Sequence, residues 1–196
     1  MRLLIISILI FLGIASYAIK YEVNDFIINP DQFNRLDSLG RRIGQWILTD
    51  PDSASCIVVN YMNGKKEGVK LIYDVVLRTK DSDTIKHYLQ SIITYADGKY
   101  HGTITEFYEN GLPFFLIRDI EPIKDFNPTP KGYSEEFKFE YQGYTVEYNQ
   151  DGTISDEGYM IFNDDYIIDF QEVGLWKYYD DSGNCIRTKD YGEYRK

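Results

Sequence analysis

The sequence predicts an all-β fold made of successive β-hairpins. Residues 61–68 and 95–102 share a tyrosine, a lysine and two glycines in register, and each places Asn-Gly or Asp-Gly after a β-branched run. Such a dipeptide between two strand-like segments is the strongest short-range hairpin signal. Three pairs of glycines nine residues apart each have an aromatic residue five positions after the first member. Tyrosine is also abundant, with 18 copies in 196 residues, and aromatic side chains favour strands.

The charge balance excludes several classes of partner. The chain carries 31 acidic and 21 basic residues, a formal net charge of -10. Affinity for nucleic acid rests on Lys and Arg displacing counterions, and the sequence has no basic cluster. An anionic membrane surface is a poor partner for an acidic chain. The hydrophobic content of 43% is typical of a folded chain rather than a disordered one.

Residues 1–18 have the pattern of a signal peptide. Arg2 precedes a nearly continuous apolar run over 3–15, and Ser16 and Ala18 supply the small residues of a cleavage site. The run is shorter than the roughly 20 apolar residues that span a bilayer as a helix. We expect cleavage after Ala18 and export to the periplasm, the outer envelope or the medium; the alternative is an uncleaved N-terminal membrane anchor. Residues 19–36 lack periodicity and are predicted to cover the first hairpin as an extended segment or a short helix.

Five degenerate copies of one hairpin unit are predicted over residues 37–191. Each copy is anchored by a strand glycine, which lets a neighbouring aromatic side chain lie across the backbone. Further glycines lie in the turns, where a positive φ causes no Cβ clash. The anchors are Gly44, Gly68, Gly102, Gly143 and Gly174, and the turn glycines are Gly64, Gly98, Gly111, Gly152 and Gly183. Residues 192–196 form a C-terminal tail.

Two insertions interrupt the copies, near residues 74–91 and 119–135. In the first, Ile85, Tyr88, Leu89 and Ile92 follow helical spacing, so residues 84–90 form either one short helix or a strand. Residues 121–132 contain three prolines and are predicted to be a loop.

The Tyr-x-Asn/Asp-Gly-Lys-x-x-Gly segments and the Gly-x-Trp strands at Trp46 and Trp176 resemble the MORN repeat family in its bacterial variant form. Residues 37–46 look like the opening repeat of exported members. The resemblance implies an elongated antiparallel sheet of successive hairpins that serves as a binding or scaffolding module. Some bacterial variants are catalogued as antitoxin components of toxin-antitoxin systems, but a secretion leader argues against neutralising a cytosolic toxin.

Cys56 and Cys185, the only cysteines, lie in the first and last copies. Adjacent strands are about 4.8 Å apart, so a straight array separates the two residues by roughly 40 Å. The Cα atoms of a disulfide are only about 4.4 to 6.8 Å apart. We therefore predict that Cys56 and Cys185 are not paired with each other.

The sequence contains no zinc, P-loop or serine-hydrolase motif. His87 and His101, the only histidines, are interpreted as polar residues rather than as a catalytic base or metal ligands. The acidic turns lack the EF-hand spacing and are interpreted as ordinary polar turns. No catalytic residue, metal or cofactor is predicted.

The predicted function is that of an exported non-enzymatic module for protein-protein interaction or scaffolding in the cell envelope. Aromatic residues offer a large contact area with a polar tip, although these side chains also suit the core of the copies. The candidate binding aromatics are Trp46, Tyr73, Phe107, Tyr148, Trp176 and Tyr179. The alternatives are a glycan- or lipid-binding envelope protein, an antitoxin-like component, and a hydrolase on a β-sheet scaffold. The sequence leaves the oligomeric state open.

Overall fold

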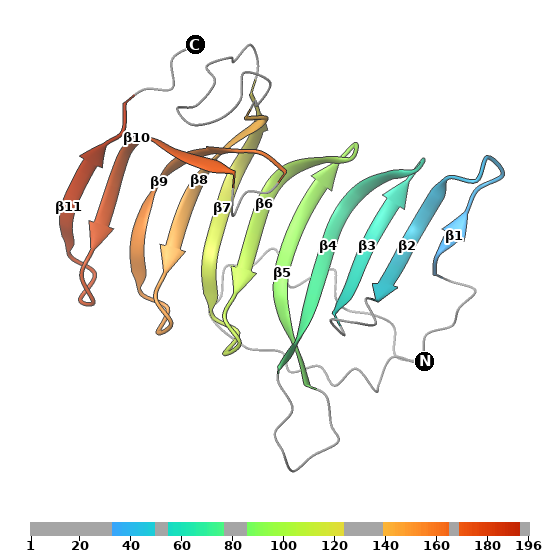
Figure 1. The fold of residues 1–196 in the computed structure, drawn as a ribbon, viewed down its shortest axis with the longest axis horizontal. Helices are drawn as coiled ribbons and strands as arrows, with labels where there is room; N and C mark the ends of the chain where they lie inside the picture. Colours follow the sequence, from blue (N-terminus) through green and yellow to red (C-terminus); the bar gives the residue numbers. More distant parts are fainter. Residues whose placement is uncertain (1–32, 50–54, 77–85, 124–138, 165–168, 193–196) are drawn as a thin grey trace.

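A computed structural model describes residues 33–49, 55–76, 86–123, 139–164 and 169–192. In these ranges eleven strands form one antiparallel sheet in which every strand pairs with its neighbours in the sequence. The same ranges contain no helix. The predicted all-β fold of successive hairpins is therefore confirmed, and the open sheet places its first and last strands at opposite ends (Figure 1).

The strands are β1 (Arg35–Leu36), β2 (Arg42–Thr49), β3 (Cys56–Met62), β4 (Lys65–Val76), β5 (Lys86–Ala96), β6 (Lys99–Phe107), β7 (Pro113–Pro122), β8 (Tyr141–Tyr148), β9 (Ile154–Phe162), β10 (Phe170–Tyr179) and β11 (Cys185–Asp190). Each even-numbered strand from β2 to β10 carries one of the five anchor glycines. Four of these glycines have a positive φ, between 65° and 85°. Gly143 on β8 differs, because a Cβ there would lie 2.4 Å from Cγ2 of Ile117, so its role is to allow close side-chain packing.

The two Asn-Gly and Asp-Gly turns have the backbone that their sequence predicts. Asn63 and Gly64 have φ values of 53° and 83°, and Asp97 and Gly98 have 52° and 84°. Positive φ at both central residues defines the type I′ turn that matches the twist of a hairpin. Each turn also bonds to the preceding hairpin, since the Gly64 amide donates to the Arg42 carbonyl at 2.9 Å. These contacts hold consecutive hairpins in register.

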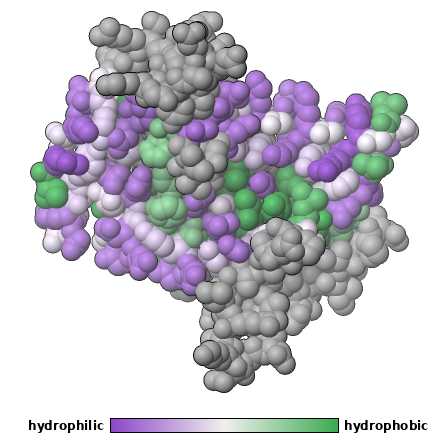
Figure 2. Space-filling model, viewed as in Figure 1, coloured by the Kyte–Doolittle hydropathy of each residue, from purple (hydrophilic) through white to green (hydrophobic). Residues whose placement is uncertain are grey.

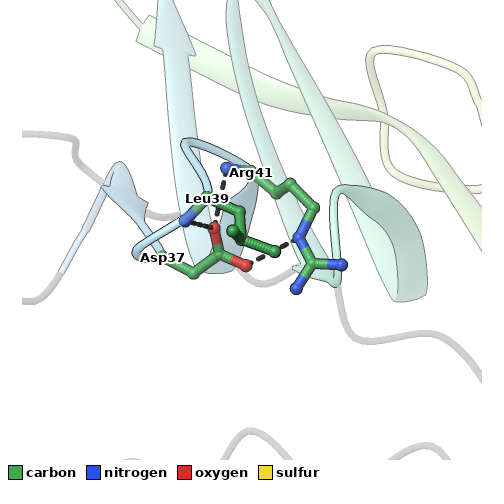
Figure 3. Close-up of polar contacts among 3 residues, drawn as sticks. All are labelled: Asp37, Leu39 and Arg41. Carbon is green, nitrogen blue, oxygen red and sulfur yellow. Dashed lines mark hydrogen bonds and ion pairs between the residues drawn. The ribbon is translucent and has the colours of Figure 1, made fainter.

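The turn before β2 is fixed by the side chain of Asp37 (Figure 3). Oδ1 of Asp37 accepts hydrogen bonds from the backbone amides of Leu39 and Arg41, each at 2.9 Å. Nε of Arg41 lies 2.7 Å from Oδ2 of the same carboxylate. The backbone N–H of Arg41 is the main reason that the pKa of Asp37 lies below its ordinary value. One carboxylate therefore accepts hydrogen bonds from two backbone amides and one side chain of the turn.

The structure decides between the two alternatives for the first insertion and corrects the prediction for the second. Residues 86–90 belong to strand β5, so the strand alternative is confirmed and the helix alternative is wrong for the part of 84–90 that the structure describes. These residues form a strand despite their helical spacing because the neighbouring strand β4 provides backbone hydrogen-bond partners, with Tyr88 opposite Asp74. Glu121 and Pro122 end strand β7 rather than begin a loop, and Pro122 pairs with Tyr141. Pro122 lies beyond Ile120, the last residue of β7 that pairs with β6, so its missing N–H interrupts no ladder on that side.

Other predicted features fall mainly outside the described residues. These include the signal peptide, residues 19–32 and most of the loop at 121–132. At the end of the predicted N-terminal segment, Arg35 and Leu36 form β1 and pair with β2. Within the described ranges no helix has the length and apolarity needed to cross a membrane.

Side chains alternate between two faces of the sheet. We call the face that carries the main buried cluster the core face, and the opposite one the outer face. A row of paired residues crosses the core face from β3 to β9: Val59, Lys70, Ile93, Ile104, Ile117, Thr145 and Gly158. Ile104 and Ile117 are completely buried there. In the space-filling view, one group of apolar residues lies in the middle of the face shown, and hydrophilic residues predominate around it (Figure 2).

Candidate functional site

A pocket of about 140 Å³ opens on the core face between β6 and β10. Two of its lining residues are acidic, four are aromatic and one is methionine. They are Glu106, Phe114, Phe115, Glu147, Met160, Phe170 and Trp176. A concave apolar site with a few polar groups is the usual form of a small-ligand site.

The strand register brings the two glutamates to the same pocket. Glu106 pairs with Phe115, and Phe115 pairs with Glu147. The two acids are therefore two strands apart in one row, with their Cα atoms about 10 Å from each other. Glu106 is only 8% exposed. Both acids occupy core-face positions in the alternation of their strands, where an apolar residue is the ordinary choice.

Glu147 has an unusual protonation equilibrium. Burial raises the pKa of its carboxyl to about 7, and the charges of Asp156 and Glu172 add to the effect. Asp156 is the next residue of the same row, directly opposite Glu147 on β9. The row continues to Tyr178, whose ring lies 3.9 Å from the guanidinium of Arg187. Asp156 on β9 and Glu172 on β10 therefore concentrate negative charge on that side of the pocket.

Trp176 forms the floor of the pocket. The side chain is 2% exposed, and its Nε1 donates to the carbonyl of Tyr159 at 2.8 Å. Its ring covers Gly158, where a Cβ would lie 2.5 Å from three ring atoms. Only glycine lets the indole approach β9 this closely. Phe114 and Phe170 are more exposed, at 36% and 42%, and so leave the pocket accessible.

The outer face carries a second organised group, which we call the outer-face cluster. Glu157 lies at its centre and accepts hydrogen bonds from the Tyr179 hydroxyl at 2.6 Å and from Nζ of Lys177 at 3.1 Å. The bond from Tyr179 is the main reason that the pKa of Glu157 is lowered. The remaining members are Arg118, Tyr144 and Tyr159.

The exposed side of this cluster is aromatic and cationic. The rings of Tyr144 and Tyr159 meet edge to face at 5.1 Å. The guanidinium of Arg118 lies 4.8 Å from the centre of the Tyr144 ring. Tyr159 is 52% exposed, and the side chains of Arg118 and Lys177 are also accessible.

The six candidate aromatics of the sequence do not form one continuous row. Trp46 and Trp176 lie on the core face, and strand alternation puts the other four on the outer face. Trp176 lines the pocket and Tyr179 belongs to the outer-face cluster. Trp46 is half-buried and donates to the Arg35 carbonyl at 3.3 Å, and Tyr73, Phe107 and Tyr148 are also half-buried. A binding role for these aromatics stays a prediction.

The thiols and histidines are dispersed. Cys56 on β3 and Cys185 on β11 are both free thiols. His101 is exposed on β6, and the side chain of His87 lies outside the described part. In the ranges that the structure describes, no three His, Cys, Asp or Glu side chains form a group able to hold a metal ion.

Sequence reasoning missed most of the pocket. The missed lining residues are Glu106, Phe114, Phe115, Glu147, Met160 and Phe170. The sequence did contain a signal for the two acids of the pocket. Glu106 lies two positions after Ile104 and Glu147 two positions after Thr145, so each is on the buried side of its strand. An acid at such a position is unexpected and therefore informative.

In comparisons with known proteins, no family model, curated protein or solved structure matches this chain.

Proposed function

We propose that this protein is an exported, non-enzymatic binding module that docks a protein partner of the cell envelope through the outer-face cluster. The observation that carries the proposal is the ordered set of exposed aromatic and cationic side chains around Glu157 on an open sheet. Export rests on the leader predicted for residues 1–18. The hairpin pattern and the anchor glycines support a MORN-like module.

The composition of the cluster suits a protein interface. Tyr and Arg are enriched in interface hot spots because they combine large contact area with polar ends. Tyr159 presents half of its surface to solvent, and Arg118 stacks beside it on Tyr144. Glu157 already fixes Lys177 and Tyr179. Binding would therefore immobilise few additional rotamers, which lowers the entropic cost of association.

The test places a photo-crosslinking amino acid at position 159 and, as a control, at Leu39, which is exposed in the turn before β2. We expect one discrete protein adduct in living cells from position 159 and none from position 39. Arg118→Glu in the position-159 background should abolish that adduct. Equal adducts from both positions, or an adduct that survives Arg118→Glu, would contradict the proposed interface.

Fractionation of the same cells tests the export part. We expect the adduct in the envelope or the medium, with the leader removed after Ala18. A full-length protein confined to the cytosol would contradict export without bearing on the cluster.

A further inference from the structure

We propose that the core-face pocket binds a small organic ammonium ion, with the carboxylate of Glu147 as counter-ion and the aromatic walls packed around the cationic head. The site lies on the face opposite the outer-face cluster and does not depend on a protein partner. Its acidic residues come from β6 and β8, and its aromatic residues from β7 and β10.

The lining has the two components that recognise a desolvated cation. Four aromatic residues line the pocket, and the π face of an aromatic ring attracts a cation within about 6 Å of the ring centre. Two glutamates also line it, and the ionised carboxylate of Glu147 supplies the opposite charge. No lysine or arginine is among the described lining residues, so the lining itself supplies no cation.

The same chemistry recurs elsewhere on this sheet with the chain's own side chains as cations. Arg42 lies 4.5 Å from the centre of the Trp46 ring, and Lys66 lies 4.8 Å from that of Tyr95. On β11, Lys189 lies 3.9 Å from the Tyr191 ring. Pairing of a cation with an aromatic ring is therefore an established form of packing in this fold, and the pocket offers the rings together with an acid.

The shape of the pocket limits the size of the ligand. A volume of about 140 Å³ fits a head group of a few heavy atoms and not a folded partner or a polymer. Phe114 and Phe170 are partly exposed beside it, so substituents on the ammonium group have a path to solvent. A neutral apolar molecule would leave the carboxyl of Glu147 without a new partner in an apolar site, which is unfavourable.

The charges around Glu147 give the site a pH dependence. The groups facing it are Glu106 on β6, Asp156 on β9 and Glu172 and Tyr178 on β10, with Arg187 on β11 already stacked on Tyr178. Because the pKa of Glu147 is about 7, a bound cation has to displace a proton below that pH. Affinity should fall on the order of tenfold from pH 8 to pH 6, with proton release on binding.

The experiment is isothermal titration calorimetry of the full chain with choline and with n-butylammonium. The control ligand is the uncharged alcohol in which carbon replaces the choline nitrogen. We expect at least one cation to bind on the order of tenfold more tightly than the alcohol, since burying an unpaired polar site costs about that much. Equal binding of cation and alcohol, or binding of neither cation, would overturn the proposal.

Variants locate the binding. Glu147→Gln should weaken cation binding on the order of tenfold and abolish its pH dependence. Phe114→Ala should also weaken cation binding. Because Phe114 is partly exposed, its loss should have little effect on the packing of the core. Met62→Ala, at an exposed position on β3 outside both proposed sites, should leave affinity unchanged. Circular dichroism confirms that each variant folds. Undiminished binding to both pocket variants would place the cation elsewhere and contradict the assignment.

Discussion

At the residue scale, Glu147 is an acid placed where the strand pattern calls for an apolar side chain. Its raised pKa has a consequence for stability. Below its unfolded pKa of about 4.3 the carboxyl is protonated in both states and has no effect. As pH rises toward the folded value of about 7, the native state holds the extra proton and loses stability relative to the unfolded state.

Glu147→Gln should therefore stabilise the protein in a pH-dependent way. We expect about 1 kcal/mol of added unfolding free energy at pH 8, reduced from the full linkage value because the group is partly solvated. No difference is expected at pH 4. Urea unfolding of wild type and variant at pH 8 and pH 4 measures the two differences in unfolding free energy. Glu109→Gln, in an exposed turn, is the control. A gain of equal size at both pH values would show that ionisation of Glu147 is not the cause.

Gly158 is a second residue with a specific packing role. Gly158→Ala should cost about 2 to 3 kcal/mol, because the new methyl group overlaps the Trp176 ring and forces the core to repack. Gly68→Ala is the matched control: its φ is 72°, but the methyl group of an alanine there would meet no atom within 4 Å. Only backbone strain of about 1 kcal/mol is expected at that position. Chemical denaturation compares the two, and equal losses would contradict the close contact at Gly158.

At the element scale, the turns were predictable because their chemistry is local. Asn63-Gly64 and Asp97-Gly98 adopt positive φ at both positions, which their residue types readily permit. The helix alternative for residues 84–90 arose from spacing within one segment. Across residues 86–90, pairing with β4 favours a strand instead. The spacing within the segment could not reveal this, because the pairing partner lies in another part of the chain.

The Asp37 turn provides a prediction at this scale. Asp37→Ala removes the acceptor of the Leu39 and Arg41 amides, so hydrogen exchange at both amides should become faster. Asp37→Asn keeps an acceptor oxygen at the same place and should preserve most of the protection. Since the pKa of Asp37 is lowered, wild-type protection should persist until pH falls below the ordinary range of a carboxyl group. Amide exchange followed by NMR measures these effects, and unchanged exchange in Asp37→Ala would contradict the role of this carboxylate.

At the scale of the whole molecule, the hairpin order was predictable and the pocket was not. The pocket depends on which residues of β6, β7 and β8 lie opposite one another. Irregularities in the ladders set that register, such as the shifts between Glu106 and Phe107 and between Val173 and Lys177. A bulge changes the facing partner without leaving a clear local pattern. Glu106 and Glu147 are 41 positions apart in the chain, and only the full register brings them together.

The open sheet also exposes its last strand. Every residue of β11 is exposed, and the strand carries Arg187, Lys189 and Asp190. Charged side chains on an edge strand discourage pairing with other chains. The formal charge of -10 acts in the same direction over the whole surface. The two faces of the sheet thus remain available for the two separate binding functions proposed above.

Because the sheet is open, its first and last strands lie far apart, and the two native cysteines report on that separation. Cys56 and Cys185 lie on the third and eleventh strands, so spin labels there should be on the order of 35 to 40 Å apart. Burial raises the pKa of Cys56, and labelling should therefore be done at mildly alkaline pH. Double electron-electron resonance on the labelled monomer should give a distance near that value. A distance below about 20 Å would mean that the sheet closes on itself and would contradict the open architecture.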